Sequence, residues 1–205
     1  YEKNNSINLD DGYGIQLSTN SIKLLNRIGF STLKKKDKFN PKKIDFYEIK
    51  KEKKICDLII SEFNSENCKY TTLKRSKLVE FLKNRLDVNI IKYGHDIEKI
   101  EKNNNQITLT FSQNNKINCD HLIISDGVFS KSKSLISNDQ IKPVYDNSIA
   151  IRGNISSSNI SNINKKNISL FMGHDFHYVI YPLSNDNEAF NFIGILKYKL
   201  TANKL

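Results

Sequence analysis

An aspartate and a glycine that follow a short apolar run have the chemistry to hold a ligand. The run Leu122-Ile123-Ile124 predicts a buried strand, and Asp126-Gly127 after it is a strong turn signal. Ser130 then stands where it can cap a following helix. In open α/β sheets, ligands bind beyond the carboxyl ends of strands, where a glycine permits close approach and a carboxylate can accept hydrogen bonds from ribose hydroxyls. An ordinary strand–turn–helix corner has the same features.

Two earlier stretches also have residue types and a spacing that would suit ligand binding. Gly12-Tyr13-Gly14 places two glycines around an aromatic residue, which is typical of a loop that lets backbone approach a flat ligand, although a simple turn fits equally well. Arg75 lies in the first turn of a predicted helix over 75–86, where a cation opposes the helix dipole. An anion held between Arg75 and the helix N-terminus would explain this position. A surface arginine paired with a nearby carboxylate is the alternative.

The elements that must position these residues mix helices and strands up to about residue 142. A helix over 20–28 is predicted to bury Ile22, Leu24, Leu25 and Ile28. The predicted strands form a hairpin (44–49 and 55–60) and a meander (96–101, 106–111 and 116–118). After Pro143 the pattern becomes antiparallel β, with strands predicted at 148–155, 168–172, 177–181 and 190–197.

Composition favours a folded protein with a charged surface. The 205 residues suffice for one domain or parts of two, and 38% hydrophobic with 10% aromatic residues argue against disorder. The formal net charge of +10 comes from lysines spread along the chain, and the run Lys34-Lys35-Lys36 falls in a predicted loop. We therefore expect a solvated basic surface and no nucleic-acid partner, while weak association with an anionic membrane surface stays compatible with the charge.

Cysteine usage and hydropathy bear on the compartment. The chain has an odd number of cysteines, Cys56, Cys68 and Cys119, and no pair of them has the spacing of metal ligands. This favours a reduced, cytoplasmic setting without a metal site. No apolar run approaches the length of a membrane span.

The order of these motifs resembles that of the FAD-dependent aromatic hydroxylases, the group A flavoprotein monooxygenases. The salicylate hydroxylase-like branch is the most similar, with the ubiquinone-biosynthesis hydroxylases nearby. Five segments carry the resemblance: Tyr1-Glu2-Lys3, Gly12-Tyr13-Gly14-Ile15-Gln16-Leu17-Ser18-Thr19-Asn20, Arg75-Ser76-Lys77-Leu78, Ile124-Ser125-Asp126-Gly127-Val128-Phe129-Ser130, and His177-Tyr178-Val179-Ile180-Tyr181-Pro182 with Asn191 downstream.

The resemblance implies a fold class and a division into domains. It implies an α/β fold with an incomplete Rossmann-like FAD-binding domain and an antiparallel meander over 1–142, followed by the beginning of a mainly β substrate-binding domain over 143–205. The family's Gly-x-Gly-x-x-Gly loop and its later Gly-Asp motif do not occur here. We therefore expect a fragment that lacks both ends and needs them to hold FAD tightly. Lys133 replaces the family's arginine after Ser130, which keeps the charge without the planar fork.

The resemblance also implies an activity. The full enzyme would be an FAD-dependent monooxygenase that uses NAD(P)H and molecular oxygen to hydroxylate a small phenolic substrate through a flavin hydroperoxide. His177 is the catalytic candidate, as an acid or base that contacts the substrate hydroxyl. A partly buried strand histidine with a structural partner is the alternative for this residue.

Seven residues take cofactor-binding roles from the resemblance. Glu2 and Asp126 would accept from ribose hydroxyls, and Arg75 would neutralise phosphate charge. The flavin would lie along Gly14-Ile15-Gln16, and the nicotinamide cofactor would lie by the Asp126-Gly127 turn. The implied cofactor-binding residues are Glu2, Gly14, Ile15, Gln16, Arg75, Asp126 and Gly127.

Two other functions stay open at the level of sequence. A flavoprotein of the same fold with other chemistry, such as a prenyl reductase or a halogenase, shares most of these motifs. A basic α/β module that binds RNA or anions without catalysis is the alternative from another class. Such a module would interleave lysines and aromatic residues on one sheet face.

Overall fold

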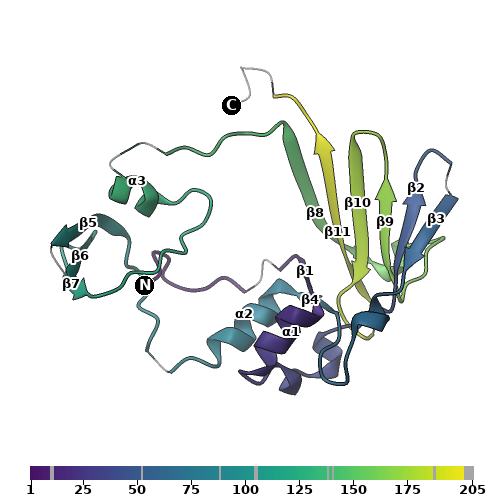
Figure 1. Ribbon diagram of the computed structural model, residues 1–205, viewed down its shortest axis with the longest axis horizontal. Helices are drawn as coiled ribbons and strands as arrows, with labels where there is room; N and C mark the ends of the chain where they lie inside the picture. The colour runs from purple at the N-terminus through teal and green to yellow at the C-terminus, as the bar shows by residue number, and fades with distance from the viewer. Residues whose placement is uncertain are drawn as a thin grey trace. The chain divides into compact units, whose positions relative to one another are not determined.

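The computed structural model describes residues 1–9, 12–51, 53–87, 89–103, 106–137, 139, 141–186 and 188–200. Its backbone forms two compact units (Figure 1). The first comprises residues 1–8 and 87–146, and the second comprises 9–86 and 147–205. Compactness and ligand-binding role are different criteria, so the division by function near residue 142 stays a prediction.

The first unit is built on the predicted meander. Its three-stranded sheet has the order β5-β6-β7, and α3 contacts β5. Leu109 and Phe111 are buried on β6, and the rings of Tyr1 and His95 pack against Phe111 with centroids 4.8 and 5.2 Å away. The elements are β5 (Ile97–Asn103), β6 (Gln106–Phe111), β7 (Lys116–Cys119) and α3 (Lys131–Ser137).

The Asp-Gly corner of this unit is partly as predicted. Ser130 caps α3 as expected, because its Oγ accepts a hydrogen bond from the Lys133 backbone N–H at 3.2 Å. The predicted strand at Leu122-Ile123-Ile124 is wrong, since these residues form no strand and pair with none in the described part of the unit. Ile123 is 89% exposed. A short apolar run becomes a buried strand only where strands pair on its flanks.

The second unit is built on a six-stranded sheet with the order β3-β2-β9-β10-β11-β8. The predicted 44–49 and 55–60 hairpin is confirmed, and all four strands predicted after Pro143 are present. β2 pairs in parallel with β9, which joins the hairpin to the later strands, and the other pairs are antiparallel. The strands are β2 (Ile44–Glu48), β3 (Lys53–Leu58), β8 (Ser148–Ser156), β9 (Ile168–Met172), β10 (Phe176–Pro182) and β11 (Ala189–Lys197).

Two helices and two short strands complete this unit. β1 (Gly14–Leu17) pairs antiparallel with β4 (Thr71–Lys74), and α1 (Thr19–Asn26) and α2 (Arg75–Lys83) follow these strands directly. Leu17, Ile22, Phe30, Leu73 and Phe81 form their buried core. Single turns of 3-10 helix lie at Phe30–Thr32, Lys35–Asp37, Ile60–Phe63 and Ser157–Asn159.

The stripe predicted for the first helix is half wrong. Ile22 is buried and Leu25 packs against the core, but Leu24 is 59% and Ile28 is 45% exposed. Ile22 and Leu24 are about 200° apart around a helix, so they cannot share a face. α1 ends at Asn26, before Ile28.

None of the helices in the described ranges is long and apolar enough to cross a membrane.

Candidate functional site

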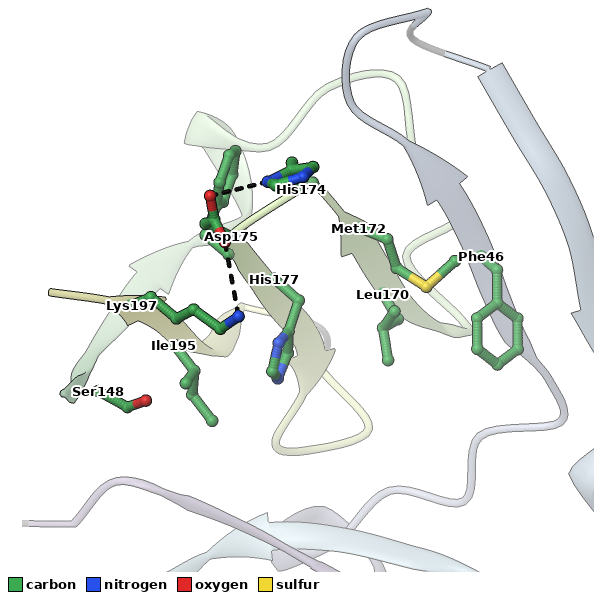
Figure 2. Close-up of a pocket in the computed structure, with 11 residues that line it drawn as sticks. Phe46, Ser148, Leu170, Met172, His174, Asp175, His177, Ile195 and Lys197 are labelled. Carbon is green, nitrogen blue, oxygen red and sulfur yellow. Dashed lines mark hydrogen bonds and ion pairs between the residues drawn. The ribbon is translucent and has the colours of Figure 1, made fainter. Parts of the chain in front are cut away.

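One face of the six-stranded sheet carries the predicted catalytic histidine, and we call it the pocket face. Side chains alternate between the two faces of a strand, and residues in register share a face. His177 on β10 is in register with Ile195 on β11, and Phe46 on β2 is in register with Leu170 on β9. Figure 2 shows His177, Ile195 and Leu170 projecting to the same side of their strands.

The pocket face is packed into a core at one end, where β10 finishes and β9 begins. Tyr181 and Ile168 are 3% and 1% exposed, and they pack with Ile60 and Leu183. Val179 and Ile193, which lie between this cluster and the outer strand ends, pack against it. The strands are therefore fixed at one end while the other end stays accessible.

A pocket of about 490 Å³ lies at the outer end of this face (Figure 2). Aliphatic and aromatic side chains form much of its lining, with polar groups concentrated at the strand ends. Such a surface suits a flat, largely apolar ligand fixed by a few polar contacts. The lining residues are Phe46, Ser148, Leu170, Met172, Gly173, His174, Asp175, Phe176, His177, Ile195 and Lys197.

His177 lines this pocket from the start of β10, the strand between β9 and β11. The side chain is exposed, and its imidazole makes no hydrogen bond with any residue that the structure describes. A partly buried histidine with a structural partner would look different, as His95 does, whose Nδ1 lies 2.6 Å from the Tyr93 carbonyl oxygen. The His177 imidazole is therefore available to a ligand.

The Gly12-Tyr13-Gly14 loop is held against the pocket face by asparagines of β8 and β11. The Gly14 backbone N–H donates to Asn191 Oδ1 at 2.5 Å, and Asn154 Nδ2 donates to the Gly12 carbonyl oxygen at 3.4 Å. A Cβ atom at position 14 would lie 2.6 Å from the Cβ of Asn191 and 2.7 Å from Leu183 Cδ2. Glycine is thus required here because backbone and sheet approach closely.

Ile15 and Gln16 continue from this loop along β1. Ile15 packs against the core between β1 and the helices. The Gln16 Oε1 atom accepts a hydrogen bond from the Tyr70 hydroxyl at 2.8 Å. Burial raises the pKa of Tyr70, and it raises the pKa of Tyr181 on the facing sheet to about 12, so both hydroxyls keep their protons at neutral pH. The Gln16 side chain is therefore anchored by the protein.

Arg75 lies beside the same loop. Its backbone N–H donates to the Tyr13 carbonyl oxygen at 2.8 Å, so the start of α2 adjoins Gly12-Tyr13-Gly14. The helix has no side-chain cap from Lys74 and no acidic residue in its first turn. The Arg75 side chain is exposed, and no carboxylate among the described residues pairs with it. A free guanidinium at an uncapped helix N-terminus is suited to an anion.

The remaining predicted residues lie in the first unit. Glu2 is fixed by backbone hydrogen bonds with Lys92 and His95, and its Oε1 accepts from the Asn4 backbone N–H at 2.8 Å. Asp126 is exposed but accepts from the Ser132 backbone N–H at 3.1 Å, and hydrogen bonds from the Ser130 hydroxyl and from Ser132 lower its pKa. A carboxylate has about four acceptor positions, so both side chains retain capacity for ribose hydroxyls.

Gly127 has the backbone freedom that its predicted role requires. Its φ is +85°, and a Cβ atom there would meet nothing within 4 Å. Within the second unit, Gly14, Ile15, Gln16 and Arg75 are neighbours, and His177 lies farther out on the sheet. Whether Glu2 and Asp126 converge with them on one ligand stays a prediction, because they belong to the other unit.

The opposite face of the sheet carries a row of aromatic rings. Phe171 stacks between Tyr47 and Tyr178, with centroids 4.8 and 4.5 Å apart. Lys54, which is in register with Tyr47, lies 2.7 Å from Asp45 Oδ1 and 2.8 Å from Asp57 Oδ2. The lysine on this aromatic face is thus neutralised by two carboxylates, which differs from the interleaved cationic platform that binds RNA.

Solved structures match this backbone along nearly its whole length. The Klebsiella pneumoniae protein HpxO, complexed with FAD and uric acid, matches 100% of this chain with a TM-score of 0.80 and 14% identity. The 2,6-dihydroxypyridine-3-hydroxylase of Arthrobacter nicotinovorans matches 98% (TM-score 0.77, 13% identity), and a salicylate hydroxylase in a substrate complex matches 93% (0.76, 16%). The chain has the fold of the FAD-dependent aromatic hydroxylases. This confirms the predicted fold class.

The chain spans about half the length of these hydroxylases, 51%, 50% and 49% respectively. No protein-family model matches the sequence, and no curated protein matches it significantly. The likeness to the hydroxylase fold therefore lies in the backbone.

Several groups that build the site in this hydroxylase fold were not predicted from the sequence. Tyr70, which anchors Gln16, and Asn154, which anchors the loop, lie in segments without any motif. The alternation along β11 could have been used to predict which of its residues share the pocket face. Ile193, Ile195 and Lys197 lie on that face and alternate with residues of the other face. Only the pairing register with β10 places that face of β11 beside His177.

Proposed function

We propose that this chain forms part of an FAD-dependent monooxygenase that hydroxylates a small phenolic substrate with NAD(P)H and molecular oxygen. The observation that carries the proposal is the junction between the Gly12-Tyr13-Gly14 loop, which is hydrogen-bonded to the sheet, and the exposed Arg75 guanidinium at the start of α2, which pairs with no carboxylate among the described residues. This junction lies in the same unit as a pocket that is lined by apolar side chains and by the exposed His177 imidazole. The backbone likeness to hydroxylases, one of them solved with FAD, supports the same activity.

The residues present fit the cofactor. The Gly12-Tyr13-Gly14 backbone, held against the sheet, would lie along the flat ring, and Arg75 with the N–H groups at the start of α2 would bind a phosphate group. Glu2 and Asp126 would accept from ribose hydroxyls, and Gly127 would allow close approach of backbone to the nicotinamide cofactor. Bound FAD, reduced by NAD(P)H, would supply the oxygen chemistry.

The substrate ring would occupy the pocket on the pocket face. Leu170 and Ile195 would contact the ring and exclude water from it. The His177 imidazole would accept or donate a hydrogen bond at the substrate hydroxyl, and near neutral pH it can hold that proton or release it. Orientation of the ring, rather than covalent chemistry by the protein, is the contribution of this unit.

Replacing Arg75 with methionine tests the proposal through cofactor affinity. Methionine keeps an unbranched side chain but removes the charge that would neutralise phosphate. We expect the dissociation constant for FAD in the full-length protein to rise about 10- to 150-fold, since a charge-assisted hydrogen bond contributes about 1.5–3 kcal/mol. Titration of the apoprotein with FAD, followed by flavin fluorescence, measures this constant.

Arg27→Met is the matched control. Arg27 is also an exposed arginine of the second unit, but it lies at the C-terminus of α1. This variant should bind FAD as the unaltered protein does. Equal affinities for all three proteins would contradict the phosphate-binding role of Arg75.

A further inference from the structure

Three charged side chains stand together at the mouth of the pocket (Figure 2). His174 and Asp175 lie in the turn between β9 and β10, and Lys197 ends β11. The Lys197 backbone N–H donates to the Asp175 carbonyl oxygen at 2.9 Å, so the turn and the strand end are joined by backbone. The sheet therefore sets the backbone positions from which these side chains project.

Asp175 lies closer to His174 than to Lys197, its second basic neighbour. Its Oδ2 lies 2.7 Å from His174 Nδ1, whereas its Oδ1 lies 3.7 Å from Lys197 Nζ. The second distance exceeds that of a hydrogen bond, and the Lys197 side chain is 75% exposed. An ammonium group has three donors, so Lys197 retains the capacity to bind another anion.

The sheet sets where Lys197 stands relative to the pocket-lining residues of β11. Lys197 follows Ile195 by two residues on the same face of β11, a separation of about 6.8 Å along the strand. Ile195 is in register with His177. A flat ring resting on Ile195 beside His177 would thus present a substituent on its outer edge to Lys197.

We propose that Lys197 makes this site selective for ligands with an anionic substituent, and that Asp175 limits this selectivity by competing for the same ammonium. The inference rests on the proposed function, because it takes a flat ring to be the ligand of the pocket. His174 adds positive charge at the mouth when it is protonated. Neutral ligands would gain less from Lys197, because they can accept its hydrogen bond but offer no opposite charge.

The test compares two probes that differ in one charge, salicylate and salicylamide. Their affinities for the full-length protein are measured by titration calorimetry, and bound FAD is measured by absorbance in the same preparation. We expect Lys197→Met to weaken salicylate about fivefold, which is the scale of an accessible ion pair, and to weaken salicylamide much less. Asp175→Asn should strengthen salicylate binding by a few-fold. Lys166→Met, at an exposed loop lysine away from the pocket lining, should change neither affinity.

The outcomes separate this inference from the proposed function. If FAD is bound but Lys197→Met weakens both probes equally or neither, the role of Lys197 is overturned and the flavoprotein proposal stands. If no FAD is bound while Lys197→Met still selectively weakens salicylate, the anion selectivity holds and the flavoprotein proposal fails.

Discussion

Replacing Gly14 with alanine is expected to destabilise the protein by about 1–3 kcal/mol and to weaken FAD binding. The added methyl group would lie 2.6 Å from the Cβ of Asn191 and 2.7 Å from Leu183 Cδ2, and both of those side chains are 1% exposed and cannot move aside. The loop would have to move off the sheet, and the hydrogen bond from the Gly14 N–H to Asn191 would break. Urea unfolding gives the loss of stability, and FAD titration gives the loss of affinity.

Gly153→Ala is the matched control for this substitution. Gly153 lies on β8 of the same sheet, and a Cβ atom there would meet nothing within 4 Å. Its free energy of unfolding should stay within about 0.5 kcal/mol of that of the unaltered protein. A loss as large as that of Gly14→Ala would show that any added methyl group destabilises this sheet, and the close approach at Gly14 would lose its significance.

Replacing Asp45 with alanine is expected to cost about 3 kcal/mol of unfolding free energy. Asp45 is 1% exposed, its Oδ1 pairs with Lys54 Nζ at 2.7 Å, and its Oδ2 accepts from Asn167 Nδ2 at 2.8 Å. The hydrogen bond from Asn167 to this buried carboxylate contributes about 1.5–3 kcal/mol, the ion pair with Lys54 adds to it, and the Asn167 amide would lose its acceptor. Asp45 also lies at the parallel junction of β2 with β9, so its loss should loosen the junction between the hairpin and the later strands.

Glu48→Ala on the same strand is the comparison that tests burial as the cause. Glu48 also pairs with a lysine, Lys51, at 3.2 Å, but the two side chains are 37% and 71% exposed. Exposed pairs contribute about 0–1 kcal/mol. Thermal or urea unfolding of both variants should therefore rank Asp45→Ala well below Glu48→Ala in stability, and equal losses would contradict the argument.

Local patterns in the sequence predicted most elements of this fold because each depends on neighbouring residues. The meander and the later strands alternate with period two, and Ser130 marks a helix boundary by local chemistry. The parallel pairing of β2 with β9 joins segments more than 100 residues apart, and no local pattern encodes such a register. The apolar run at Leu122-Ile123-Ile124 failed for the complementary reason, since its hydrophobicity does not supply a partner strand.

The candidate site divides in the same way. Gly14 and Arg75 belong to compact motifs whose backbone requirements show in the sequence, and the structure makes them neighbours through the hydrogen bond from Arg75 to Tyr13. Asn154, Tyr70 and Lys197 act through partners distant in sequence, so residue type alone gave no reason to select them. Residues that hold a site together through tertiary contacts thus require the fold.

Substrate-stimulated oxidation of NAD(P)H by the purified full-length protein would show directly whether the protein is a flavin-dependent monooxygenase. We expect a yellow protein with a flavin absorbance spectrum. Its NADH or NADPH oxidation should accelerate when a phenolic acid is added, with oxygen consumed and a hydroxylated ring recovered. A colourless protein that cannot be reconstituted with FAD, or a flavoprotein that consumes no oxygen with any member of a phenol panel, would contradict it.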